Sequence, residues 1–172
     1  RSPACGGTRS RARMQKKEVA ESCFDLLHHS MVETFTAANR AHPERDLEQM
    51  GFTVGGKLAE KYVRDRALFV DELEVMTFVC KDFWTEVYGK QMDKLRTNHK
   101  GVFELQDHRF RAILRVSTGP EGNALEAARK LLIFPCGVIR GALDALGLVA
   151  TVRADVTGLP AVTFVINVER PG

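Results

Sequence analysis

The sequence predicts an α+β domain, because three helix-type patterns come first and strand-type patterns flank one further helix. Apolar residues recur every three or four positions over 17–40, 44–63 and 68–90. Strand-type stretches then appear over 94–106 and 149–168, on either side of a fourth helical stretch at 124–146. This order differs from the regular strand–helix alternation of parallel α/β folds.

The length and composition fit one globular domain with its own core. The chain has 172 residues, of which 44% are hydrophobic and 27% charged. The longest apolar stretch contains Pro135 and stops at Arg140, well short of the roughly 20 residues that a membrane span needs. We therefore expect any membrane contact to be peripheral.

The charge is divided unevenly between a short N-terminal stretch and the rest of the chain. Residues 1–17 hold six basic and no acidic side chains, whereas the other residues hold 19 basic and 22 acidic ones. We interpret residues 1–16 as a disordered basic tail or an upstream extension, and 17–170 as the folded domain. Two alternatives for this stretch are that translation starts at Met14, or that the residues before it are a fragment of an Arg-rich transit peptide. The acidic balance of the domain argues against nucleic-acid binding.

The first two helices each carry a broad apolar stripe. Three glycines lie within the second helix, and each weakens an isolated helix by up to ~1 kcal/mol relative to alanine. Their presence predicts close packing against a neighbouring element. The third helix is apolar on several sides, which predicts a central position with Phe83 and Trp84 buried.

The second half of the chain predicts a hairpin, an extended piece, a helix and two strands. The turn 99–101 joins strands at 94–98 and 102–106, and 110–116 is predicted to be extended. In the fourth helix, Pro135 is expected to kink the helix or divide it in two. The turn 157–160 then joins strands at 149–156 and 161–168.

No catalytic or metal site emerges from the motifs, so we expect neither an enzyme nor a cofactor. The stretch from Gly51 to Lys57 matches G-x-x-x-x-G-K, but it lacks the preceding strand and the Ser or Thr that a phosphate-binding loop needs. The histidines show no metal-ligand spacing. The cysteines show no paired pattern either, which favours a reducing, cytosolic compartment.

Two small residues one turn apart, Gly137 and Gly141, permit close approach on the fourth helix. They favour helix–helix or helix–sheet packing. The alternative is a groove for an apolar ligand, which would make the protein a small-molecule or lipid-binding module.

Two motifs resemble those of the small subunits of TRAPP, the transport protein particle. Residues 50–60 (MGFTVGGKLAE) are similar to the second-helix signature of that family, and 136–143 (CGVIRGAL) to its fourth-helix signature. The stretches 80–84 (CKDFW) and 90–101 (KQMDKLRTNHKG) are similar to the subunit 6 branch. In the fourth-helix signature, the residues that we expect to have a structural role are Cys136, Gly137, Arg140 and Gly141.

The resemblance implies a twisted antiparallel sheet of about four strands with helices packed on one side. It also implies a non-catalytic assembly subunit that heterodimerises with subunit 3 of the same family. The implied complex tethers vesicles and acts as an exchange factor for Rab-type GTPases in ER-to-Golgi and Golgi traffic. This places the protein in the cytosol, peripheral at cis-Golgi membranes. Subunit 3 carries an acylated cysteine ahead of its third helix, but residues 63–68 (VRDRAL) contain none.

The first two helices are the expected partner interface, because their apolar stripes are wider than one core contact requires. An uncovered remainder of this kind marks an interaction site. The alternative is that both stripes pack wholly within the domain. The candidate interface residues are Leu26, Leu27, Met31, Val32, Phe35, Leu47, Met50, Gly51, Val54, Gly55 and Leu58.

Overall fold

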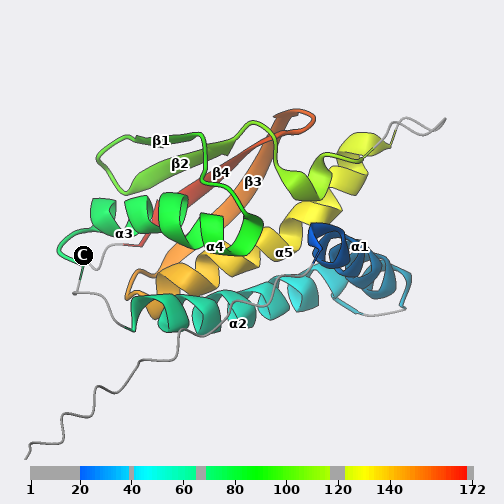
Figure 1. The fold of residues 1–172 in the computed structure, drawn as a ribbon, viewed down its shortest axis with the longest axis horizontal. Helices are drawn as coiled ribbons and strands as arrows, with labels where there is room; N and C mark the ends of the chain where they lie inside the picture. Colours follow the sequence, from blue (N-terminus) through cyan, green and yellow to red (C-terminus); the bar gives the residue numbers. More distant parts are fainter. Residues whose placement is uncertain (1–19, 39–40, 65–68, 117–122, 170–172) are drawn as a thin grey trace, which may run out of the picture.

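Helices cover one face of a four-stranded antiparallel sheet in the computed structural model of the protein (Figure 1). The structure describes residues 20–38, 41–64, 69–116 and 123–169. The predicted tail, 1–16, lies outside the described residues. The elements are α1 (Glu21–Ala37), α2 (Pro43–Val63), α3 (Glu72–Phe78), the π-helical turn η1 (Val79–Phe83), α4 (Trp84–Tyr88), β1 (Lys94–Thr97), β2 (Val102–Asp107), the 3-10 turn η2 (Arg111–Ile113), α5 (Ala124–Ala145), β3 (Ala150–Gly158) and β4 (Ala161–Val168).

Helix α5 lies between the sheet and α2. Figure 1 shows α3 and α4 beside α5 under the sheet, and α2 on the far side of α5. Helix α1 contacts α2, α5 and η2 near the end where α2 begins. Helices α1 and α2 therefore form the outer layer of the domain, away from the sheet. The predicted α+β fold with helices on one side of a four-stranded antiparallel sheet is confirmed.

The sheet has the strand order β1-β2-β4-β3, so β1 and β3 are its edges. All neighbouring strands are antiparallel, and both predicted hairpins form. The first turn uses His99 and Gly101 with φ of 58° and 91°, a conformation in which glycine costs least. Alternate residues of β2 and β4 are buried under the helices. The opposite face carries polar and charged side chains such as Arg96, Glu104 and Arg153, as expected for a sheet with one solvated face.

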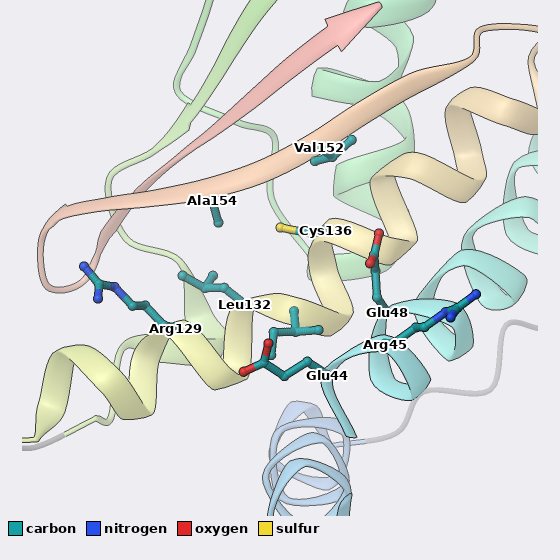
Figure 2. A pocket seen from close by; sticks show the side chains of 9 residues that line it. Glu44, Arg45, Glu48, Arg129, Leu132, Cys136, Val152 and Ala154 are labelled. Atoms are coloured by element: carbon teal, nitrogen blue, oxygen red, sulfur yellow. The ribbon is translucent and has the colours of Figure 1, made fainter. Parts of the chain in front are cut away.

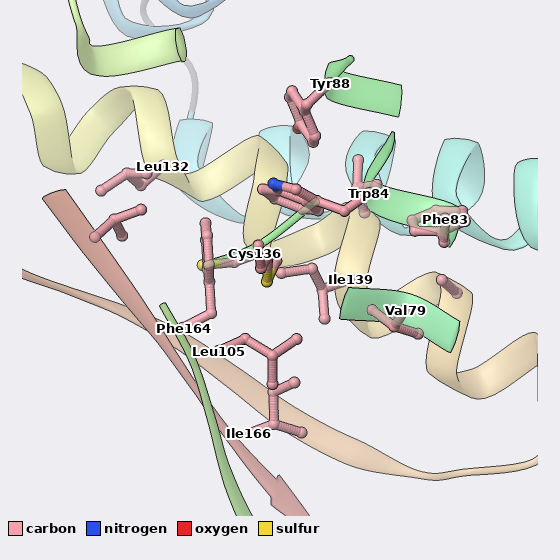
Figure 3. Close-up of a cluster of buried hydrophobic side chains, with 14 of the residues drawn as sticks. Val79, Phe83, Trp84, Tyr88, Leu105, Leu132, Cys136, Ile139, Phe164 and Ile166 are labelled. Carbon is pink, nitrogen blue, oxygen red and sulfur yellow. The ribbon is translucent and has the colours of Figure 1, made fainter. Parts of the chain in front are cut away.

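The core is built around the third helical stretch, and Phe83 and Trp84 are fully buried as predicted. The Trp84 ring contacts a tilted Tyr88 ring and the edge-on Phe164 ring, whose centroids lie 4.2 Å and 5.3 Å away (Figure 3). Its indole Nε1 donates to the buried Asp107 carboxylate at 3.2 Å, and Lys90 Nζ pairs with the same carboxylate at 2.6 Å. This network anchors the end of α4 to β2.

One prediction about local structure was wrong, and the structure makes two others more exact. Residues 110–116 are not a strand, because the chain turns through η2 and packs Ile113 into the core. Of the two alternatives for Pro135, a division of the helix is excluded, because α5 runs unbroken from Ala124 to Ala145. The third helical stretch forms as predicted, and within it residues 79–83 form a π-helical turn between α3 and α4. Packing against several neighbours outweighs these local preferences.

Candidate partner interface

The inner face of α2 packs against α5 through glycines on both helices. Leu47, Gly51, Gly55 and Ala59 recur every four residues and are buried on the side that meets α5. Four glycines line this contact, which we call the α2–α5 seam. A Cβ at any of them would overlap a backbone carbonyl oxygen of the facing helix. The overlapping pairs are Gly51 with Phe134, Gly55 with Val138, Gly137 with Glu48, and Gly141 with Phe52. The two helix backbones are therefore in direct contact, as the glycines within the predicted helix indicated.

This contact fills the space that an apolar ligand would need under Gly137 and Gly141. The G-x-x-x-x-G-K match also lies wholly within α2, so it has helical rather than phosphate-cradling geometry. Arg140 extends the contact at the edge of the seam. Its Nε lies 2.9 Å from a carboxylate oxygen of Glu48, and its guanidinium lies 4.5 Å from the centroid of the Phe52 ring. The family motif in α5 thus holds α2 in place.

The outer face of α2 carries two apolar side chains among polar ones such as Thr53 and Lys57, and the described part of the chain leaves these two partly exposed. Met50 and Val54, one turn apart, are 36% and 37% exposed. Leu58, one turn further on, is half-buried against the core. Leu47, Gly51 and Gly55 lie inside the domain, so they are not available to a partner. The part of α2 that can meet a partner is therefore Met50 and Val54, with Leu58 at its margin.

Helix α1 likewise has a buried inner side and an exposed outer side, and the difference in exposure is larger than on α2. Leu26 and Leu27 are 70% and 67% exposed, whereas Val32 is buried. Met31 and Phe35 are half-buried against the core. An ion pair of 2.8 Å between Arg111 Nε and Asp25 ties α1 to η2. The helix is fixed on its inner side and presents two adjacent leucines outward.

A histidine occupies the inner side of α1. His28 is 2% exposed, and neither ring nitrogen has a hydrogen-bond partner of ordinary geometry among the described residues. It packs against the rings of Phe24 and Phe134, whose centroids lie 6.2 Å and 5.4 Å away. Burial, reinforced by His29 and opposed by Asp25 and the nearby Leu131 backbone, lowers the pKa of His28 to about 4. His28 is therefore neutral at physiological pH and acts as part of the apolar core.

A cavity of about 430 Å³ lies between α2, α5 and β3. Leu132 and Cys136 of α5 lie opposite Val152 and Ala154 of β3, and Glu48 reaches toward the strand from α2 (Figure 2). Burial, together with the nearby Glu48 and Asp155, raises the pKa of the Cys136 thiol to about 12. Burial likewise raises the pKa of Cys80. Both thiols are protonated near neutral pH, and a protonated thiol is a poor nucleophile and metal ligand.

The described ranges contain no metal-binding group of three or more His, Cys, Asp or Glu side chains. They also contain no helix long and apolar enough to cross a membrane. The exposed large apolar side chains of these ranges include Leu26 and Leu27 on α1 and Met50 and Val54 on α2.

The comparisons with known proteins agree with the two sequence motifs. The family model for transport protein particle (TRAPP) components matches residues 24–169. The chain belongs to the TRAPP component family. It is 44% identical over 156 residues to trafficking protein particle complex subunit 6B of Mus musculus, an alignment that covers 87% of this chain and 98% of that protein. It is 45% identical over 124 residues to subunit 6A of Homo sapiens, covering 72% and 77% of the two chains.

The predicted TRAPP resemblance, including its subunit 6 branch, is thereby confirmed. A TRAPP subunit 3 from Naegleria fowleri, solved with covalently bound palmitic acid, superimposes with a TM-score of 0.71 at 14% identity. That alignment covers 87% of this chain and 95% of the other, and it shows a shared fold. The chain is thus a TRAPP-type trafficking complex subunit of the subunit 6 branch.

Proposed function

We propose that this TRAPP protein is a non-catalytic assembly subunit that binds TRAPP subunit 3 through the outer faces of α1 and α2. The observation that carries the proposal is the exposure of Leu26 and Leu27 on α1 and of Met50 and Val54 on α2, two helices that contact each other. Four large apolar side chains on the same outer layer are costly to leave in water, at roughly 25 cal/mol per Å² of apolar surface. A permanent partner would remove that cost.

The choice of subunit 3 rests on the shared fold and the family resemblance. Two chains of one fold can pair through equivalent helical faces about an approximate two-fold axis, as identical subunits do. Met31, Phe35 and Leu58 are half-buried and border the exposed residues. In the assembled dimer they would form the edge of an apolar interface centre, with polar residues around it.

The cellular role follows from assembly. The proposed complex tethers vesicles and promotes nucleotide exchange on a Rab-type GTPase in ER-to-Golgi and Golgi traffic. This subunit contributes a rigid module to it and contacts membranes through the other subunits. The proposed location is accordingly the cytosolic surface of ER–Golgi and cis-Golgi membranes.

Leu27→Glu tests the interface directly. The substitution places a carboxylate at the exposed outer side of α1, so the isolated protein should keep its circular-dichroism spectrum. Binding to subunit 3 from the same organism should weaken by roughly a hundredfold, because the charge would be desolvated in the dimer. The measurement is gel filtration of the mixed subunits with light scattering, followed by calorimetric titration.

Leu125→Glu is the matched control. Leu125 is 41% exposed on α5, outside α1 and α2. This variant should bind subunit 3 as the wild type does. Unchanged binding by Leu27→Glu, or equal losses in the two variants, would place the interface elsewhere.

A further inference from the structure

Strand β3 is a long sheet edge whose outer side meets no other strand of the described ranges. It spans nine residues, and within those ranges it pairs only with β4. The opposite edge, β1, has only four residues. An unpaired edge of this length presents backbone donors and acceptors to any strand that can align with it, and proteins usually protect such edges.

The inward side of β3 is also incompletely covered. Val152 and Ala154 point toward the helices, yet both are half-buried because they line the cavity beside α5 (Figure 2). A second hollow of about 430 Å³ continues along the strand, where Val149 is 56% exposed. The apolar side of the edge strand is thus open where a further strand would lie.

The two charged side chains on the outward side of β3 can form ion pairs with the same two side chains of a second copy. Arg153 and Asp155 are exposed on the solvated face of the sheet, one on each side of Ala154. If two β3 strands run antiparallel about a two-fold axis at Ala154, Arg153 of each copy lies directly opposite Asp155 of the other. Directly opposed residues have Cβ atoms about 4.5–5.5 Å apart, close enough for an ion pair.

The same alignment also matches the apolar side. Val152 of one copy lies opposite Val156 of the other, and the two Ala154 residues face each other. In this alignment, charged residues meet charged residues on the solvated face and apolar residues meet apolar residues on the other face. A shift of the pairing by one residue would place charged residues opposite apolar ones. The register shift in the β3–β4 ladder lies between Asp155 and Gly158, so it includes Val156 but neither of the two charged residues.

We infer that a second copy of this chain docks on β3, joining two four-stranded sheets into one antiparallel sheet. The pairing is isologous, so it closes on itself as a dimer rather than growing into a fibre. It uses a different surface from the outer faces of α1 and α2, and it does not depend on the function proposed above. The consequence is that two assemblies, each with one such subunit, can be linked through their sheets.

Charge exchange at the two positions tests this pairing. Arg153→Glu places a carboxylate opposite Asp155, and Asp155→Arg places a guanidinium opposite Arg153. Each variant should therefore self-associate about tenfold or more weakly than the parent. A mixture of the two variants restores pairs of opposite charge and should associate more strongly than either variant alone. The double variant Arg153→Glu/Asp155→Arg restores both ion pairs with their signs exchanged, so it should associate with itself as the parent does.

The measurement is sedimentation equilibrium of the full chain over a range of concentrations. Leu27→Glu serves as the parent, so that α1 does not contribute, and circular dichroism checks that each variant is folded. Recovery in both the mixture and the double variant supports the pairing. A parent that stays monomeric at all concentrations, or a mixture no stronger than its components, would overturn it.

Discussion

The two faces of α2 are both free of charge over their central turns, yet they serve opposite purposes. The inner face carries glycines and lets the backbone of α5 approach until no Cβ fits between the helices. The outer face carries Met50 and Val54, which the domain leaves exposed. The inner face is therefore required by the fold, whereas the outer face adds nothing to the isolated domain. Helix α1 repeats the contrast with His28 inside and Leu27 outside.

The largest effect is expected from closing the inner contact. Gly141→Ala would push a methyl group into the Phe52 carbonyl, and two backbones cannot yield as a flexible side chain can. We expect a loss of about 3 kcal/mol or more in the free energy of unfolding, at the upper end of overpacking effects. Urea denaturation followed by tryptophan fluorescence would measure it.

Gly56→Ala is the control for that prediction. Gly56 is also in α2, but a Cβ there would lie 3.4 Å from the Gly141 carbonyl oxygen, at the margin of ordinary contact. The variant should be as stable as the wild type or more stable by up to ~1 kcal/mol, since alanine favours the helix. Equal destabilisation by both substitutions would mean that helix geometry, rather than close approach, explains the glycines.

The second effect concerns the inner side of α1 at acidic pH. Because the pKa of His28 falls from 6.5 to about 4 on folding, the unfolded chain takes up a proton before the folded one does. The associated stability is fully present above pH 6.5 and is lost as the pH falls toward 4, by about 3 kcal/mol. His28→Leu should abolish this loss while keeping the site apolar.

Urea denaturation curves at pH values of about 7.5, 5.5 and 4 would measure how the free energy of unfolding depends on pH. These values cover the range between the unfolded and the folded pKa of His28. The exposed His42 provides the control, because His42→Gln alters a histidine outside the core. A pH profile that is unchanged in His28→Leu would show that other groups cause the acid sensitivity.

The sequence predicts the fold well where periodicity and turn residues agree. The four helical stretches and both hairpins lie within a few residues of their predicted positions. The errors occur where tertiary packing decides. Residues 110–116 are rich in apolar side chains, as a buried strand would be, but the chain turns through η2 and buries Ile113. Helix α5 continues through Pro135, and it is held between the sheet and α2.

The candidate interface is predicted less completely, for a geometric reason. A helical wheel shows that α2 is apolar on a broad arc, but it cannot show which part of the arc meets α5. Gly51 and Gly55 therefore entered the interface prediction although they lie inside the domain. The burial of His28 and the open edge of β3 depend on contacts between distant segments, which single-sequence patterns do not reveal.

The smallest change in stability is expected on the outer face of α2. Met50→Ser and Val54→Ser shorten side chains that are about one third exposed, so each should lower the free energy of unfolding by no more than about 1 kcal/mol. Together they should weaken binding to subunit 3 by roughly tenfold, because their apolar surface would be buried only in the dimer. Gly141→Ala should therefore lose mainly stability, whereas the Met50→Ser/Val54→Ser variant should lose mainly affinity for subunit 3. Urea denaturation and calorimetric titration of the same preparations would measure both quantities. A double variant that loses about 3 kcal/mol of stability, as much as Gly141→Ala, would show that the outer face also supports the fold, and the distinction between the two faces would fail.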